Sequence, residues 1–223
     1  MKHCIYLLLA LLIIACQEAP KKKMETSSPK SLLDSIADAY GYQSWADVEQ
    51  ISFTFNVDRP TRKSARSWHW DIKNSLVRST IDTVTVQYNK QQVDSTMMGV
   101  DARFINDSYW LLFPFKLVWD RDSFTYEVES MNEASNKEVV NRKVTISYGD
   151  SGGYTPGDVY DFYINSDYHI TEWTWRKSND SVARIRTKLA RPEHFNGLWF
   201  NTHHQGEDEL SIYFSGVEVL LKD

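Results

Sequence analysis

The sequence predicts a mainly β fold with a few helices, in which roughly ten strands form an antiparallel meander. Three observations indicate this class. From residue 51 onward, apolar and polar residues alternate in short segments separated by turn-forming residues. Helical spacing is clear only near the start of the folded part, so nothing suggests a parallel sheet with alternating helices. Aromatic residues, which are common in strands, make up 13% of the 223-residue chain.

The first fifteen residues have the pattern of a signal peptide. Lys2 supplies a positive charge, and an apolar run extends from Cys4 to Ala15. This run is shorter than the ~20 residues that span a bilayer as a helix, but it suits a signal-peptide core. It ends in Ile-Ile-Ala-Cys16, the form of a bacterial lipobox, whose cysteine is acylated. We expect residues 1–15 to be removed and Cys16 to carry the lipid; an ordinary signal peptide with an incidental cysteine is the alternative.

Residues 16–30 are predicted to be a lipidated N-terminus and tether, because they are polar, contain two prolines and lack periodicity. Several acyl chains on one cysteine anchor firmly, since each buried methylene contributes about 0.8 kcal/mol. Cys4 and Cys16 are the only cysteines, which excludes a disulfide framework and a zinc–thiolate site in the folded part. We expect residues 31–223 to form a single domain.

The first folded element is predicted to be a helix. Apolar residues recur at helical spacing between Leu32 and Tyr40. Ser31 can cap the start together with Asp34, and Gly41 suits a left-handed end.

Alternating segments then predict the strands. They cover residues 51–57, 68–72, 84–88, 124–128, 144–148, 159–164, 173–175 and 210–221. Gly216 interrupts the last of these and predicts a β-bulge.

Residues 106–119 break the alternation and are mostly apolar. Their start offers capping residues, and Pro114 lies in the middle, so we expect a short helix that ends near Phe113. A helix that is apolar on every side must be covered by a core or by something that it binds. Core packing against the sheet and a lid over an apolar concavity are both consistent with this pattern.

Two strands each place two tryptophans on one face, Trp68 with Trp70 and Trp173 with Trp175. In a flat sandwich these side chains would be core. In a strongly curved sheet the same face lines a groove wide enough for a fatty chain. The candidate lining residues are Phe53, Phe55, Trp68, Trp70, Trp110, Leu111, Leu112, Trp173 and Trp175.

Motifs that could carry chemistry are weak. Gly-Asp-Ser151-Gly-Gly matches the serine motif of chymotrypsin-like proteases, but the nearest upstream histidine, His69, lies in a tryptophan-rich strand, so we interpret the motif as a polar turn. His203 and His204 are adjacent and would point to opposite faces of a strand, which prevents joint chelation. We predict no catalytic residue, no metal and no cofactor.

The charge balance argues against nucleic acid as a partner. Thirty acidic and 25 basic residues give a formal charge of −5, whereas a phosphate-binding surface needs a basic excess.

The order of motifs between residues 31 and 221 resembles that of bacterial periplasmic lipid-handling proteins of the LolA/LolB/RseB type, including Bacteroidetes-type lipoproteins of uncharacterised role. The segments that carry the resemblance are Phe53–Phe55, Arg66–Asp71, Tyr109–Pro114, Asp158–Ile164 with Ile170–Trp173, and Asn196–Phe200. The resemblance implies a curved antiparallel sheet, an unclosed β-barrel, with an N-terminal helix and a helical lid in the opening. It transfers no functional residue.

On this basis we expect a membrane-anchored cell-envelope lipoprotein that binds an acyl chain or a lipidated peptide in the groove without catalysis. One alternative is a structural or protein-interaction lipoprotein whose aromatic faces are fully packed. Another is an envelope hydrolase that uses acidic residues in a cleft. Gln17, rather than the Asp that enterobacterial inner-membrane lipoproteins carry after the lipidated cysteine, favours the outer membrane by resemblance.

Overall fold

The computed structural model describes residues 31–81, 83–132, 140–151 and 156–222. Residues Ser31–Asp223 form one compact unit. The expected signal peptide, lipidated Cys16 and tether lie outside the described residues. Within the described part of the chain, no helix is long and apolar enough to cross a membrane.

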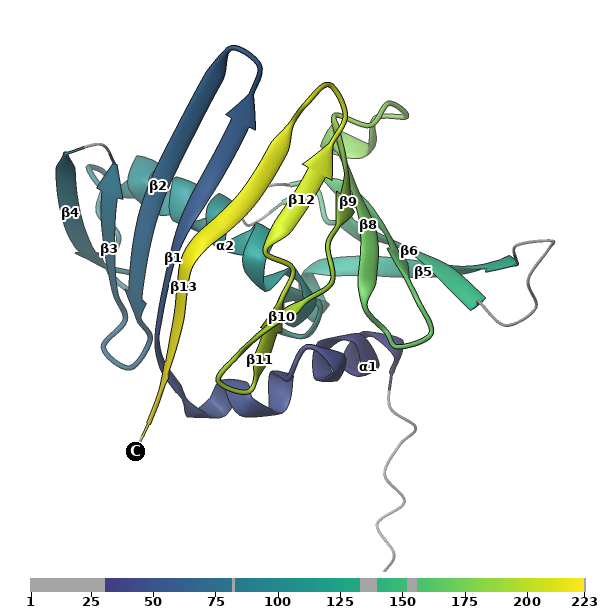
Figure 1. The fold of residues 1–223 in the computed structure, drawn as a ribbon, viewed down its shortest axis with the longest axis horizontal. Coiled ribbons are helices and arrows are strands. Elements are labelled where there is room, and N and C mark those ends of the chain that lie inside the picture. Colours follow the sequence, from purple (N-terminus) through teal and green to yellow (C-terminus); the bar gives the residue numbers. More distant parts are fainter. Residues whose placement is uncertain (1–30, 82, 133–139, 152–155, 223) are drawn as a thin grey trace, which may run out of the picture. The chain divides into compact units, whose positions relative to one another are not determined.

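An antiparallel sheet of eleven strands dominates the structure, in the order β4-β3-β2-β1-β13-β12-β9-β8-β7-β6-β5 (Figure 1). Its strands are β1 (Val48–Arg59), β2 (Arg62–Asp71), β3 (Leu76–Ile81), β4 (Val84–Asn89), β5 (Phe124–Asn132), β6 (Val140–Tyr148), β7 (Val159–Ile164), β8 (Ile170–Arg176), β9 (Ile185–Leu189), β12 (His203–Gly206) and β13 (Ser211–Leu221). A separate two-stranded sheet joins β10 (Glu193–Phe195) to β11 (Leu198–Phe200). The helices are α1 (Leu32–Ala39) and α2 (Met98–Trp119), with 3-10 turns η1 (Tyr42–Asp47), η2 (Arg121–Ser123) and η3 (Lys177–Asn179).

Helix α1 begins and ends as predicted. The Ser31 hydroxyl accepts a hydrogen bond from the backbone N–H of Asp34 at 3.2 Å and donates one to the Asp34 carboxylate at 2.6 Å. Gly41 adopts φ +83°, the left-handed conformation that ends the helix. Leu33 and Ile36 are buried on the side that faces the core.

Helix α2 connects β4 to β5, the two edges of the sheet, so the chain must cross one face of the sheet to reach the far edge. Figure 1 shows α2 crossing that face behind β1 and β13. The two edge strands do not pair with each other, so the sheet is curved but unclosed. This is the arrangement that the resemblance implied.

The predicted extent of the helix that contains Pro114 was wrong. Instead of a short helix that ends near Phe113, α2 runs from Met98 to Trp119 and passes through Pro114. Proline removes one helical hydrogen bond, but Phe113 and Phe115 on either side are buried, and this burial holds the helix together across the defect. Asp107, near the predicted start of the helix, instead lies in its middle and is buried.

The predicted strands correspond to β1, β2, β4, β5, β6, β7, β8 and β13. The bulge at Gly216 is confirmed, since the β1–β13 register shifts between Ser52 and Thr54, opposite this glycine, which has φ +59°. The alternation did not reveal strands β3 and β9–β12, because they are short or carry few apolar residues.

Candidate functional site

A hollow of about 890 Å³ lies between α2 and the concave face of the sheet. This volume falls within the range of small-molecule binding pockets, about 300–1,000 Å³. Its walls come from α2, from β1 and β2, from β13, and from β6 to β9. Strands from both halves of the sequence therefore contribute to one concavity.

Strand alternation explains which side chains reach the hollow. On β1, Ile51, Phe53, Phe55, Val57 and Arg59 share the concave face, because successive residues point to opposite sides. Ile51 and Phe53 are covered completely, whereas the next three along the strand line the hollow. The helices thus cover one end of the concave face and leave the end toward the β1–β2 hairpin open.

One stripe of α2 forms the opposite wall. Ala102, Ile105, Asn106, Tyr109 and Lys116 all line the hollow, at spacings that place them on one side of a helix. With a rise of 1.5 Å per residue, this stripe is about 21 Å long. The hollow is therefore an elongated groove along the helix.

Aromatic rings in mutual contact form the floor. The ring centroids of Trp110 and Trp173 lie 4.0 Å apart in an edge-to-face arrangement, and Tyr160 stacks on Trp173 at 5.3 Å. Tyr109 packs against Tyr160 at 5.2 Å, and its hydroxyl lies 3.0 Å from that of Tyr148. Burial raises the pKa of Tyr109 and of Tyr148, so both hydroxyls stay uncharged.

The nine lining residues predicted from the sequence fall into two groups. Phe55, Trp110, Trp173 and Trp175 line the hollow. Phe53, Trp68, Trp70, Leu111 and Leu112 belong to the packed core or lie against it.

Trp68 and Trp70 both contact Phe104 of α2, with ring centroids 5.4 and 5.5 Å apart. Leu111 borders a separate void of about 10 Å³, room for roughly one water molecule.

Several lining residues escaped the sequence analysis. Val57 and Ile212 lie on predicted strands, face each other in the β1–β13 register and could have been found from the alternation. Ile185 lies opposite Trp175 on β9, a strand that was not predicted. Ala102 and Ile105 lie on a part of α2 that was not predicted to be helical.

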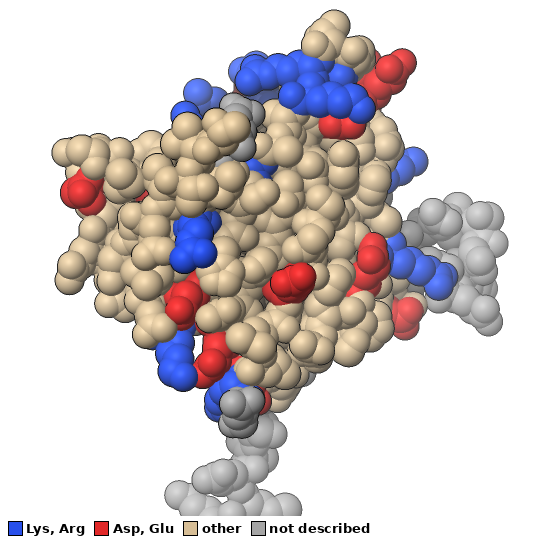
Figure 2. Space-filling model, turned by 60° about the vertical axis from the view of Figure 1, so that its left-hand side comes forward, with Lys and Arg blue, Asp and Glu red and all other residues tan. Residues whose placement is uncertain are grey.

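Charged groups are distributed unevenly around the hollow. Arg59 and Arg66 line it where β1 and β2 meet, whereas Asp120 and Asp122 line it at the C-terminal end of α2. Lys116 lies 3.6 Å from Asp120, and burial lowers the pKa of this lysine. In Figure 2, basic side chains gather along the upper margin, at the height of the β1–β2 hairpin in Figure 1, above a broad area with few charged side chains.

The serine of the protease-like motif, Ser151, also lines the hollow. None of the described residues around the hollow is a histidine, and the protease mechanism requires a histidine base beside the serine. As predicted, His203 and His204 lie on opposite faces of a strand, β12; His203 is exposed and His204 is buried. No cluster of metal-ligating side chains occurs among the described residues.

No protein-family model matches the chain, and no curated protein sequence matches it. The chain is similar in structure to a LolA superfamily protein from Nitrosomonas europaea, with a TM-score of 0.49, 11% identity, and coverage of 87% of this chain and 95% of that one. It is similar to a DUF1329 family protein from Desulfovibrio piger, with a TM-score of 0.45, 11% identity, and coverage of 85% and 94%. A domain of an outer membrane lipoprotein-sorting protein from Vibrio parahaemolyticus has a TM-score of 0.45, 6% identity, and coverage of 82% and 90%.

Proposed function

We propose that the protein is a lipid-anchored cell-envelope protein that binds a hydrophobic ligand, an acyl chain or a lipidated peptide, in the hollow between α2 and the sheet. It would hold this ligand without transforming it. Acylated Cys16 would anchor it, in the outer membrane, and the polar segment after Cys16 would let the folded domain face water beside the lipids.

The open hollow with aromatic walls is the observation that carries this proposal. Trp175 is half-buried at the hollow, and Trp110 and Trp173, although mostly buried, also line it. A hydrocarbon chain in the hollow would contact these rings and leave water. Each buried methylene would contribute about 0.8 kcal/mol, so a chain of moderate length suffices for firm binding. A purely structural lipoprotein has no need of an open hollow of this size.

Native mass spectrometry of the unacylated chain without residues 1–16 tests the proposal, since the compact unit that starts at Ser31 is retained whole. We expect a protein species that carries a co-purified lipid, and displacement of a fluorescent fatty acid by unlabelled palmitate. A ligand-free spectrum together with no binding of the fluorescent fatty acid would contradict the proposal.

A further inference from the structure

We infer that the ligand of the hollow is an anionic amphiphile, a hydrocarbon chain that ends in a carboxylate or phosphate, and that Arg59 and Arg62 bind its charged group. This inference rests on the proposed function and narrows it to one chemical class. It is carried by the distribution of charge over the two faces of the β1–β2 hairpin.

The register of the hairpin places Arg59 directly opposite Arg62. Both belong to the concave face. Arg59 lies two residues after Val57, and Arg62 lies two residues before Ser64, the partner of Val57, so strand alternation puts all four side chains on one side. Arg59 lines the hollow, and Arg62 lies beside it at the hairpin end. Two like charges directly opposite each other on one face destabilise a strand pair.

Neither arginine has an ion-pair or hydrogen-bond partner for its side chain within the described structure, and both are exposed. Arg66, the third arginine on this face, is neutralised by Asp107. The hairpin therefore keeps two guanidinium groups free at the end of an apolar groove. An anion between them would remove their repulsion and accept hydrogen bonds from both.

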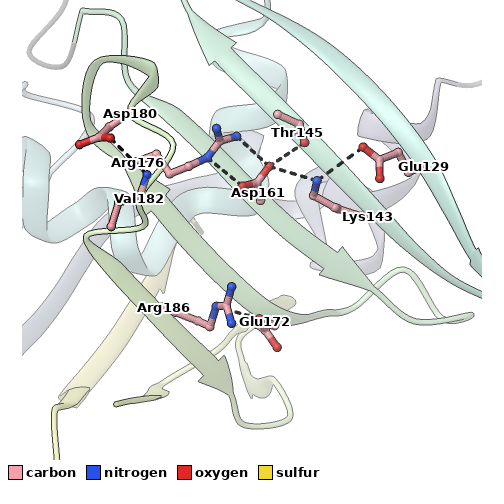
Figure 3. Close-up of polar contacts among 9 residues, drawn as sticks. All are labelled: Glu129, Lys143, Thr145, Asp161, Glu172, Arg176, Asp180, Val182 and Arg186. Atoms are coloured by element: carbon pink, nitrogen blue, oxygen red, sulfur yellow. Dashed lines mark hydrogen bonds and ion pairs between the residues drawn. The ribbon is translucent and has the colours of Figure 1, made fainter. Parts of the chain in front are cut away.

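The other face of the same hairpin is arranged differently. There Lys63 pairs with Asp58 at 2.9 Å. The pattern continues across the convex face of the sheet, where Figure 3 shows Arg176 bonded to Asp161 at 3.0 Å and Arg186 facing Glu172 at 3.6 Å. Lys63, Arg176 and Arg186 on the convex face thus have carboxylate partners, whereas the two arginines at the groove do not.

Acidic residues at the far end of the groove do not cancel this charge. Asp120 follows the last residue of α2 and lies thirteen residues beyond Asp107, the partner of Arg66. This separates Asp120 from the Arg66 side of the groove by about 20 Å along the helix axis. This exceeds the screening length of roughly 8 Å at physiological salt. An anionic group is therefore favoured at the arginine end, with its chain lying over Phe55 and Trp110.

Isothermal titration with three probes that share one hydrocarbon chain tests the inference. Each probe is used below its micelle-forming concentration. The probes are palmitate, 1-palmitoyl lysophosphatidic acid and uncharged monopalmitoylglycerol. We expect at least one anionic probe to bind about tenfold or more tightly than the uncharged one, and this preference to fall in Arg59→Gln/Arg62→Gln. Lys63→Gln, a neighbouring change on the other face, should keep the preference.

The two anionic probes distinguish a carboxylate from a phosphate ligand. Equal affinities for all three probes, or a preference that the double variant retains, would overturn the inference and leave the proposed function standing. Failure of all three probes to bind the wild-type chain would overturn both.

Discussion

Arg66 on β2 and Asp107 on α2 form a two-pronged ion pair that fastens the long helix to the sheet. Arg66 Nε and Nη2 donate to the Asp107 carboxylate at 2.7 and 2.6 Å, and Trp68 Nε1 donates to the same carboxylate at 2.8 Å. The Asp107 side chain is fully buried, so its charge depends on these donors. The hydrogen bonds to Asp107 raise the pKa of Arg66.

Replacing Asp107 with alanine is expected to lower the free energy of unfolding by about 3 kcal/mol, because the partly buried Arg66 and the Trp68 N–H lose their acceptor. Urea unfolding of Asp107→Ala measures this loss. Asp122→Ala, at an exposed position, is the control and should change stability by less than about 0.5 kcal/mol. Equal stability of the two variants would mean that the ion pair does not hold α2.

His204 is a buried imidazole beneath the hollow, in edge contact with Trp110. Its Nε2 lies 3.1 Å from the backbone carbonyl of Asn201, which can only accept, so Nε2 carries the proton. The opposite nitrogen, Nδ1, has no partner within the described structure. Burial lowers the pKa of His204 from 6.5 to about 4.

Stability should therefore fall as the pH drops from about 6.5 toward 4. In this window the unfolded chain binds a proton at residue 204 and the folded chain does not, which favours unfolding at lower pH. Between pH 7 and pH 5 the wild type should lose about 2 kcal/mol more than His204→Gln. Exposed His203→Gln should follow the wild type. Parallel pH profiles for wild type and His204→Gln would contradict the assignment.

Gly41 is expected to tolerate no side chain. Its φ of +83° disfavours any residue with a Cβ, and a Cβ here would overlap the carbonyl oxygen of Gly197. Gly41→Ala should lower the unfolding free energy by about 2 kcal/mol or more, as measured by thermal or urea unfolding. Gly99 in α2 is the matched control, because a Cβ at that position would meet no atom within 4 Å and alanine favours helices. A stable Gly41→Ala chain would show that Gly41 and Gly197 do not approach each other so closely.

The sequence alone predicts well which side chains share one face of a strand. An apolar residue at every second position is a local signal, and burial of the apolar face stabilises the same arrangement in the fold. Phe55, Trp173 and Trp175 were found this way. It does not predict how far along each strand the hollow extends. Phe53 and Phe55, two residues apart on one face, were therefore both assigned to the groove, although Phe53 is buried in the core and does not line it.

Helix α2 was the main error, for a related reason. Pro114 is a strong local stop signal, but the apolar side chains on both sides of it pack between the sheet and α1, and tertiary packing prevails over the local preference. Asp107 is likewise of a residue type that favours helix caps. Its place inside the helix is explained only by its hydrogen bonds to Arg66 and Trp68 of β2, which is distant in the sequence.

The central claim, that the hollow holds a hydrocarbon chain, is tested most directly by filling the hollow. Ala102 lines it on α2, and Ala65 is exposed on the convex side of β2. Affinity for a fluorescent fatty acid should fall by about tenfold or more in Ala102→Trp, because the indole occupies the space of the chain, and should stay unchanged in Ala65→Trp. Wild-type affinity in a folded Ala102→Trp chain would contradict the claim.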